Sequence, residues 1–535
     1  MHSELEVNLL RRQNLGDSLR RSAQAAPDKP AVIFYTTDGA TEAHTYAQLN
    51  ALVNVVANNL VRRGIKKGDR VAALSRNNVP FLALGYALHK IGAWLIPVNF
   101  MLQAADVRHL IEFAEARWFF VEDALVGNVD GVPGKTACVE QFVQFSVSGK
   151  APPAGWMAFA ELASGAADEP QVLIESDDVA TMFFTSGTES SPKGVLTSHA
   201  NFYASHLAWA LNFGLAQDDR LLMSLPLIHV AGYLFSTYAL ANQVTIVMTQ
   251  VPQPMQMVDL VARHRLSVTV LPPTLYVAML SCPAFAAADL RCVSKLGTWA
   301  STIPKSMIDG WKQAAPSSRF FSVQGSSEST ASLLTGGWVD SWDQMPNQDG
   351  RWVGRVASVA ADVRLVDEDG RDVDIGESGE QIVRGPVIMK GYYKNDEVNR
   401  RVFRDGWFHT GDILFRDAAG NYFFADRKKD MIKTGGENVY CQEVESVLGT
   451  HAGVMQCAVF GLPDERWGEA VTAAVIARPG VTVTEAELVE FCRDRLPGFK
   501  APKRIHFRSS LPISAANKIL KRDLKAEYAD VAKGG

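Results

Sequence analysis

The sequence has few cysteines, and none has the paired spacing of a metal or redox site. Its six cysteines lie scattered through 535 residues without a CxxC pair. This argues against a structural zinc site or a disulfide framework and favours reduced thiols. The chain also lacks the run of about 18 apolar residues that a membrane-spanning helix requires, and its first residues lack the basic and apolar regions of a signal peptide. We therefore expect a cytoplasmic protein that does not enter a membrane.

An excess of charge of either sign is likewise missing. The 53 lysines and arginines nearly balance the 58 aspartates and glutamates and leave a formal net charge of −5. Such a balance gives no sign of nucleic-acid binding or of a polybasic membrane anchor. Apolar residues, by contrast, make up 47% of the chain. Together with the length, this fraction predicts a large core divided among about three or four compact units of roughly 150 residues.

Helical and β-rich patterns alternate along the chain from about residue 33 to residue 122, and again from residue 199 to residue 271. This alternation predicts an α/β fold in which helices cover mainly parallel strands. From about residue 354, alternating patterns predict a smaller β-rich subdomain, and a compact α+β pattern follows the charged run 426–430. We expect helices at 46–63 and 199–213, strands at 71–74, 93–98, 180–184, 244–248, 268–271 and 380–385, and a strand with a turn at 363–371.

The segment from Thr185 to Gly194 is rich in small hydroxyl residues and glycine, and it follows the predicted strand 180–184. Backbone N–H groups of such a loop can converge on an anion, and Lys193 adds positive charge, so we interpret the segment as a phosphate-binding loop. In a Walker A loop the lysine follows glycine and precedes Ser or Thr. Lys193 instead follows Pro192 and precedes Gly194, which excludes that class. The alternative is an ordinary turn between strands.

Four further segments accompany this loop in a fixed order along the chain. Together with the loop they resemble the adenylate-forming superfamily, which comprises acyl-CoA synthetases, luciferases and the adenylation domains of peptide synthetases. The resemblance extends over nearly the whole chain. It implies a large N-terminal adenylation domain at 1–426, built of helix-covered mixed sheets plus a β-rich subdomain, then a hinge at 427–430 and a small mobile α+β domain at 431–535. The segments are PLIHVAG at 226–232, QGSSE at 324–328, GWFHTGD at 406–412 with 426–439 just beyond it, and LPISAANKILKR at 511–522.

The resemblance also implies the chemistry. A carboxylic acid attacks the α-phosphorus of ATP, pyrophosphate leaves, and the acyl-adenylate passes to an acceptor. Because two anions meet, the site must supply positive charge and oriented donors. The implied catalytic residues are Lys518, Glu328 and His229. The implied ATP-binding residues are Thr185, Ser186, Gly187, Thr188, Lys193, Gly325, Ser326, Ser327, Asp412 and Arg427, and the implied Mg²⁺ ligands are Glu328 and Thr188.

The same resemblance assigns roles around the acid and the acceptor. Trp299 stands where many relatives have a glycine, and an indole there fills much of a tunnel. We therefore expect an apolar acid of limited length, such as an aryl, cyclic or short alkyl acid. His229 is expected to act as a gate beside the acid. The residues so assigned are His229, Tyr233, Trp299 and Ala300 for the acid, Lys429 for the hinge, and Gly435 and Gly436 for the acceptor tunnel.

The chain departs from the superfamily pattern at four positions. Glu189 and Ser190 occupy a loop tip that usually reads Thr-Gly, and a carboxylate near phosphates is unfavourable unless it points away or meets Mg²⁺. Gln324 stands at a position that is generally aromatic and stacks on adenine, so we expect some stacking energy to be lost. Asn517 replaces the glycine that normally precedes the catalytic lysine.

Several of these residues also have a structural interpretation. Asp412 can be a turn residue, Glu328 a helix cap, Lys518 a solvated surface charge and His229 a packed core histidine. The preferred function is an ATP-dependent carboxylic acid:CoA ligase, with CoA as co-substrate. The alternative is an amide ligase that passes the adenylate to an amine or amino acid, and a third hypothesis is a non-catalytic binding protein. The oligomeric state, a homodimer included, is left open.

Overall fold

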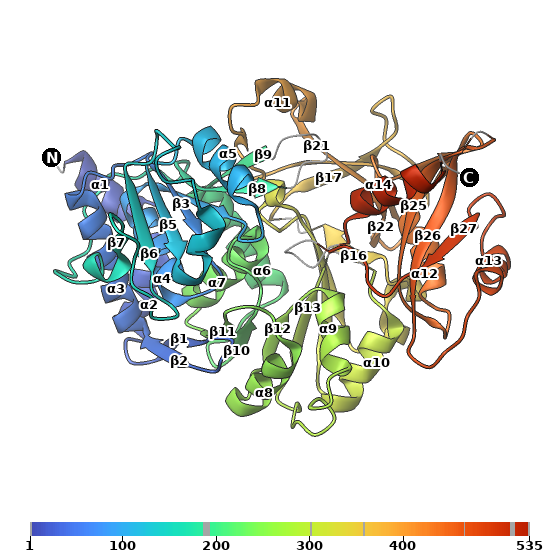
Figure 1. Cartoon of the computed structure of the whole chain (residues 1–535), viewed down its shortest axis with the longest axis horizontal. Coiled ribbons are helices and arrows are strands. Elements are labelled where there is room, and N and C mark those ends of the chain that lie inside the picture. The colour runs from blue at the N-terminus through green and yellow to red at the C-terminus, as the bar shows by residue number, and fades with distance from the viewer. Residues whose placement is uncertain are drawn as a thin grey trace.

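Two large sheets and one small sheet organise the chain, which runs from the N-terminal part on the left of Figure 1 to the C-terminal part on the right. The computed structural model describes residues 3–185, 193–299, 302–356, 359–464, 466–513 and 519–532. Its helices are α1 (Glu4–Arg11), α2 (Leu15–Ala25), α3 (Tyr46–Arg62), α4 (Val79–Ile91), α5 (Ala104–Ala114), α6 (His199–Asn212), α7 (Val230–Ala241), α8 (Pro254–His264), α9 (Pro273–Leu280), α10 (Lys305–Ala314), α11 (Asp396–Val402), α12 (Cys441–Leu448), α13 (Glu485–Arg493) and α14 (Lys521–Ala532).

The first sheet has a parallel centre that is buried on both faces. Val71 and Ala73 of its strand β3 enter one core, whereas Ala72 and Leu74 enter another beneath helix α5, because successive side chains of a strand point to opposite faces. Strands β4 to β8 join this centre in parallel, and β9 pairs antiparallel with β8. The order is β19 (Gly391–Tyr392), β9 (Lys193–Ser198), β8 (Val179–Thr185), β4 (Trp94–Val98), β3 (Arg70–Leu74), β5 (Trp118–Glu122), β6 (Gln141–Phe145) and β7 (Met157–Ala158).

The second sheet joins a parallel part to an antiparallel part. Strands β1 and β10 to β14 are paired in parallel, and the pairing turns antiparallel from β15 onwards. The predicted β-rich subdomain is therefore hydrogen-bonded to the central sheet through β16, although it packs on a core of its own. The order is β17 (Asp362–Val366), β18 (Gly379–Arg384), β21 (Trp407–Arg416), β22 (Tyr422–Arg427), β16 (Trp352–Val356), β15 (Leu334–Val339), β14 (Arg319–Gln324), β13 (Lys295–Thr298), β12 (Val268–Val270), β10 (Arg220–Met223), β11 (Thr245–Thr249), β1 (Pro30–Tyr35) and β2 (Thr41–Thr45), with β20 (Phe403–Arg404) beside β21.

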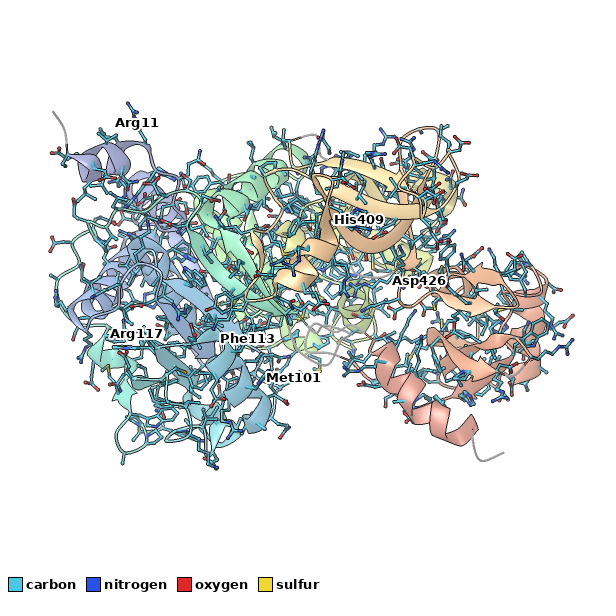
Figure 2. All side chains as sticks on the ribbon, turned by 90° about the horizontal axis from the view of Figure 1, so that it is seen from above. Arg11, Met101, Phe113, Arg117, His409 and Asp426 are labelled. Carbon is cyan, nitrogen blue, oxygen red and sulfur yellow. The ribbon has the colours of Figure 1, made fainter. Side chains whose placement is uncertain are left out.

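The small sheet lies in the C-terminal part, which follows Asp426 at the right of Figure 2. An Asp426 carboxylate oxygen accepts a hydrogen bond from the backbone N–H of Cys441, at 2.5 Å, and so links strand β22 to the start of α12. Helices α12 and α13 pack on one core with this sheet, and α14 packs on a second. Its strands are β24 (Glu437–Val439), β23 (Ile432–Thr434), β26 (Gly468–Ala477) and β25 (Val454–Asp464), with β27 (Arg504–Phe507) parallel to β26.

The structure confirms the predicted α/β fold with a large N-terminal domain of mixed sheets and a smaller C-terminal domain. The predicted helices 46–63 and 199–213 are α3 and α6, and the seven predicted strands are β3, β4, β8, β11, β12, β17 and β18. None of the described helices combines the length and the apolar character needed to cross a lipid bilayer.

Candidate active site

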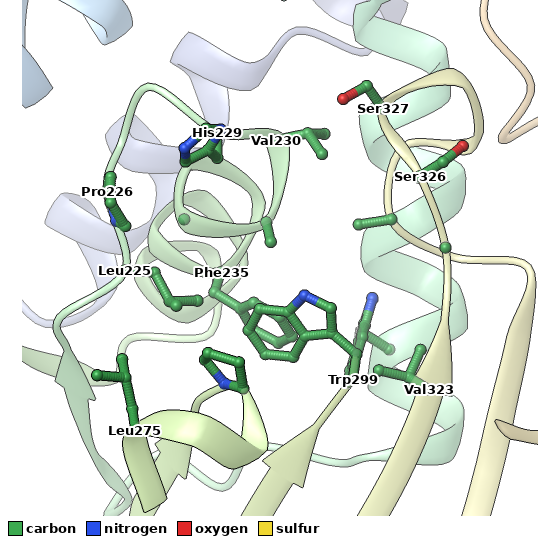
Figure 3. A pocket seen from close by; sticks show the side chains of 16 residues that line it. Leu225, Pro226, His229, Val230, Phe235, Leu275, Trp299, Val323, Ser326 and Ser327 are labelled. Carbon is green, nitrogen blue, oxygen red and sulfur yellow. The ribbon is translucent and has the colours of Figure 1, made fainter. Parts of the chain in front are cut away.

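An apolar cavity of about 850 Å³, the solvent at its mouth included, lies beside helix α7 (Figure 3). Trp299, which follows β13, faces Phe235 of α7, with the ring centroids 6.2 Å apart and the planes at 27°. Polar groups gather at one end, where His229, Ser326 and Ser327 lie (Figure 3). The lining residues are Trp209, Leu225, Pro226, His229, Val230, Ala231, Gly232, Phe235, Pro272, Leu275, Trp299, Val323, Gly325, Ser326, Ser327 and Ala331.

Two of the four residues predicted to bind the acid, His229 and Trp299, line this cavity. Tyr233 does not; it is fully buried, and its hydroxyl lies 2.6 Å from Nε2 of His89 on α4. Ala231 and Gly232 share a helical face with Phe235, because side chains three or four positions apart lie above one another. Tyr233, two positions before Phe235, points away from that face and into the core. Ala300 lies outside the described residues.

Sequence reasoning missed most of the cavity wall. Trp209 comes from α6, Leu275 from α9 and Val323 from β14, so the wall is assembled from elements that lie far apart along the chain. The only available signal was the apolar character that these residues share with the rest of the core. A pattern along one helix or strand cannot separate a cavity wall from a packed interior.

The ends of the predicted phosphate loop are held together by strand pairing. Thr185 closes β8 and Lys193 opens β9, and the two residues are partners in the antiparallel ladder. The Lys193 Nζ lies 5.4 Å from the centre of the Tyr392 ring. The residues between them, which include Ser186, Gly187, Thr188, Glu189 and Ser190, lie outside the described ranges.

Tyr392 joins this loop to Glu328. Its hydroxyl donates a hydrogen bond of 2.9 Å to Oε1 of Glu328, and the backbone carbonyl of Glu328 accepts one of 2.8 Å from the N–H of Met389. Tyr392 was not among the predicted site residues. It belongs to the short strand β19, which pairs with β9 beside Lys193, and this long-range pairing left no local pattern in the sequence.

The backbone around Glu328 turns tightly. A Cβ atom on Gly325 would lie 2.4 Å from the carbonyl carbon of Ala331, so the position requires glycine. Ser326 precedes a 3-10 helix of one turn, Ser327–Ser329. The backbone N–H of Ser326 donates to Oγ of Ser329 at 2.9 Å. Ser329 therefore takes the capping position that Glu328 was alternatively predicted to fill, and the Glu328 carboxylate faces Tyr392.

Asp412 projects from a bulge between two antiparallel strands. The β18–β21 register passes from Ile382 opposite His409 to Glu380 opposite Ile413, so one residue of β18 faces three residues of β21. Gly411 within the bulge has φ +73°, a left-handed conformation that favours glycine. Bulges of this kind re-aim a side chain. Asp412 is thus held by sheet geometry, and the interpretation as a simple turn residue is wrong.

Cationic side chains surround this aspartate. Arg427 is its partner across β22, with Nε 3.6 Å from Oδ1 of Asp412. Desolvation lowers the pKa of Lys429, and the positive charges of Arg427 and, more weakly, Lys193 lower it further. The Asp412 charge opposes that shift. The charges of Arg427, Asp412 and Lys193 therefore all act on Lys429, which follows the end of strand β22.

Other predicted residues lie in the C-terminal part or outside the described residues. Gly435 and Gly436 form the turn between β23 and β24, and the N–H of Gly435 donates to the carbonyl of Trp467 at 2.7 Å. Lys518 and Asn517 lie outside the described residues. The residues that flank them meet, because the N–H of Leu520 donates to the carbonyl of Pro512 at 2.8 Å.

Known proteins resemble this chain over almost its full length. The sequence model of the AMP-binding enzyme family matches residues 19–393, and that of the AMP-binding enzyme C-terminal domain matches residues 443–518. The long-chain-fatty-acid–CoA ligase FadD13 of Mycobacterium tuberculosis (strain ATCC 25618 / H37Rv) is 33% identical over 525 residues, covering 97% of this chain and 99% of that protein. The feruloyl-CoA synthase of an Amycolatopsis species is 32% identical over 522 residues, covering 97% and 100%. ATP-bound MatB from Rhodopseudomonas palustris superposes with a TM-score of 0.84 at 27% identity, covering 97% of this chain and 100% of that one.

Proposed function

The chain belongs to the AMP-binding enzyme family, and we propose that it is an AMP-forming ligase that joins an apolar carboxylic acid to CoA through an acyl-adenylate. One observation carries the proposal. Gly325, Ser326 and Ser327 line the apolar cavity, and the next residue, Glu328, contacts Tyr392 beside Lys193. An acid whose apolar part fills the cavity therefore presents its carboxylate to the region where positive charge and hydrogen-bond donors converge.

The first half-reaction follows from this arrangement. A carboxylate oxygen of the acid forms a bond to the α-phosphorus of ATP, and the bond to the bridging oxygen breaks as pyrophosphate takes the electron pair. Lys193 and the loop before it would hold the departing phosphates, and Asp412 and Arg427 would bind the ribose hydroxyls. Lys518 would lie between the carboxylate and the α-phosphate and neutralise charge as they approach. Losing one oriented donor of this kind typically lowers the rate by about 10²- to 10³-fold.

Glu328 suits a Mg²⁺ site. Magnesium is usually held by one or two carboxylates together with substrate phosphates, and among the described residues no group of three or more His, Cys, Asp or Glu side chains forms a self-sufficient metal site. When bound, the ion would neutralise charge on the phosphates. Glu328 would supply one hard oxygen ligand, and its hydrogen bond from Tyr392 fixes the direction of the carboxylate. Thr188, the second proposed ligand, lies outside the described residues.

The cavity supports an apolar acid with a single carboxylate and limited length. Its described lining contains no lysine or arginine that could pair with a second carboxylate. Trp209, Phe235 and Trp299 give the wall flat aromatic faces, on which an aryl acid packs in offset or edge-on contact. Of the two relatives named above, one acts on a long-chain fatty acid and the other forms a feruloyl thioester. We favour the second type of acid because Trp299 restricts length.

For the second half-reaction we propose that residues 431–535 swing about a hinge at 427–430 on the adenylation domain, residues 1–426. Lys429 would be the hinge residue, and Gly435 and Gly436 would then line the tunnel for the acceptor thiol. The backbone hydrogen bond between Gly435 and Trp467 would make Trp467 move together with the turn between β23 and β24.

Trp467 also supports CoA as the acceptor. The guanidinium carbon of Arg466 lies 4.6 Å from the centre of the Trp467 ring, and Nζ of Lys503 lies 5.7 Å from it. An aromatic ring with two cations near it suits a phosphorylated adenosine, which has both a ring to stack and negative charge. We also propose a cytoplasmic location, and a homodimer is one of the oligomeric states that the sequence leaves open.

The test separates the two half-reactions. The protein is mixed with Mg-ATP and a panel of acids, and each reaction is divided between CoA and amino acids before mass spectrometry of the products. We expect acid-dependent pyrophosphate and an acyl-CoA thioester; an amide without thioester would show an amine ligase instead. Lys518→Ala should abolish adenylate formation yet leave thioester formation from supplied acyl-AMP. If the variant still forms the adenylate at the wild-type rate, the role given to Lys518 is wrong.

A further inference from the structure

Two buried glutamines are paired beside Asp412, and one of them, Gln324, donates to its carboxylate. Nε2 of Gln324 donates to Oδ2 of Asp412 at 3.0 Å and to Oε1 of Gln381 at 2.7 Å. Nε2 of Gln381 donates in return to Oε1 of Gln324 at 3.0 Å. Gln324 is 7% exposed and Gln381 is fully buried. The two amides thus form a closed pair, and the remaining N–H of Gln324 is directed at the aspartate.

The orientation of this pair is fixed by charge. If the Gln324 amide were reversed, its oxygen would face a carboxylate oxygen, which has no proton to donate. Asp412 therefore selects the orientation of Gln324, and Gln324 selects that of Gln381. Hydrogen bonds to an ionised group are also shorter and stronger than those between neutral groups. The pair has one favourable arrangement, and that arrangement fixes the rotamer of Asp412.

Gln381 also fixes the backbone that carries Asp412. Its carbonyl accepts a hydrogen bond of 2.8 Å from Oγ1 of Thr410, and that hydroxyl accepts one of 3.0 Å from the N–H of Asp412. Gln381 is the β18 residue that faces the bulge. The network therefore closes on itself: the main chain of Gln381 holds the backbone of Asp412, and its side chain acts through Gln324 on the carboxylate. Arg427 approaches the other oxygen, Oδ1.

We propose that Gln324 and Gln381 are positioning residues that set nucleotide selectivity through the sugar. This rests on the proposed function, in which Asp412 binds the ribose hydroxyls. Gln324 stands where the superfamily generally has a ring that stacks on adenine. Both polar ends of its amide are engaged with Gln381 and Asp412, so the side chain serves the ribose site instead of the base. The enzyme should therefore depend strongly on the 2′- and 3′-hydroxyls of ATP.

The test uses Gln324→Glu, which keeps the size of the side chain and replaces its donor. The full-length protein is titrated calorimetrically with ATP, 2′-deoxyATP and 3′-deoxyATP. Wild type should bind ATP about 10- to 100-fold more tightly than the two analogues, as expected for hydrogen bonds to a charged group. At about pH 8 the variant should lose most of this preference for ATP over the deoxy analogues, because the introduced carboxylate, when ionised, repels the carboxylate of Asp412. At about pH 5.5 a protonated Glu side chain donates again, and the ratio should return.

Gln250→Glu is the matched control. Nε2 of Gln250, also buried, donates to Oε1 of the buried Glu122 at 2.9 Å, away from the cavity and from Asp412. This variant also places two carboxylates together, so its stability should depend on pH, but its ATP to deoxyATP ratio should match the wild type. In addition, Gln324→Glu should raise KM for ATP at pH 8 without changing KM for the acid, a separation that general unfolding does not produce.

The outcomes distinguish this inference from the proposed function. A wild-type ratio in Gln324→Glu at both pH values overturns the inference, as does a wild type that binds ATP and the deoxy analogues equally. A ratio that falls at pH 8 and returns at pH 5.5 supports it even if no acid yields pyrophosphate, a result that would overturn the ligase activity alone. Acid-dependent pyrophosphate release, together with an unchanged ATP to deoxyATP ratio in Gln324→Glu, would support the ligase activity and refute the positioning role of the two glutamines.

Discussion

Trp299 offers the most direct test of the substrate class. Its indole lies in the cavity against Phe235, with the ring centroids 6.2 Å apart, and it is half-buried. Replacing it with alanine removes the ring and keeps a Cβ, so the backbone does not gain the freedom of glycine. The cavity should lengthen at this point. Acids too long for the wild type should then be accepted.

The size of the effect follows from area. A fully buried tryptophan buries about 150–250 Å² of surface. Burying one methylene group contributes about 0.8 kcal/mol, which corresponds to roughly 30 Å² of apolar surface at about 25 cal/mol per Å². Because Trp299 is only half-buried, the space released holds about three methylenes. Those methylenes contribute about 2.4 kcal/mol, which is about 60-fold in kcat/KM. Trp299→Ala should therefore shift the preference toward acids about three carbons longer by about 60-fold, relative to the wild-type profile.

The assay measures kcat/KM for straight-chain and aryl acids by release of pyrophosphate. Trp156→Ala is the matched control, because Trp156 is also half-buried and also stacks on a phenylalanine, Phe142, at 5.0 Å and 29°. Trp156 is not among the residues that line the cavity. Both variants should lose some stability, and only Trp299→Ala should change the chain-length profile. An unchanged profile would refute the claim that the indole limits the acid.

Two further predictions concern stability. Nζ of Lys521 lies 2.8 Å from Oε1 of Glu445 in a largely buried ion pair, so Lys521→Met should lower the free energy of unfolding, measured in urea, by about 3–5 kcal/mol. The double variant Lys521→Met with Glu445→Leu should recover part of that loss, and an equal or greater loss in the double variant would contradict the prediction. Burial lowers the pKa of His206 to about 3, so the unfolded chain binds a proton below about pH 6.5 that the folded protein excludes. The contribution of His206 is therefore complete above pH 6.5 and should fall by about 1.4 kcal/mol per pH unit as the pH drops toward 3. Urea titrations at several pH values should show a shallower decline in His206→Gln, and identical slopes would exclude His206 as the cause.

The helices and strands of the central sheets were predictable because their signals are local. The helix 46–63 begins at Tyr46 behind a capping box in which Thr45 and Gln48 exchange hydrogen bonds, a pattern that is written in neighbouring residues. The joining of the β-rich part to the second sheet was not predictable. It depends on the pairing of β16 with β22, in which Trp352 meets Phe423, and no periodicity records which distant strands become neighbours.

The site divides in the same way. The motifs predict that Lys193, Glu328 and Asp412, which lie far apart in the chain, share one site, and the chain belongs to the AMP-binding enzyme family. They could not supply Tyr392, which reaches Glu328 only because β19 pairs with β9. The motifs also predicted Tyr233 in the acid pocket. Tyr233 instead lies on the face of α7 that packs against α4, so its side chain is in the core. Position in a motif predicts proximity to a site, but the face of the element decides contact.

Gln324 shows why a departure from a family pattern must be interpreted together with its spatial neighbours. From the sequence it was expected only to lose stacking energy on adenine. Its partner Gln381 lies 57 positions further along the chain, and nothing near position 324 indicated a second buried amide. A lone glutamine at 7% exposure would carry the desolvation penalty of an unpaired amide, so the substitution is tolerable only where a second amide and an anion complete its hydrogen bonds. Gln381 and Asp412 meet that requirement, so the amide at position 324 is satisfied by partners that only the fold brings beside it.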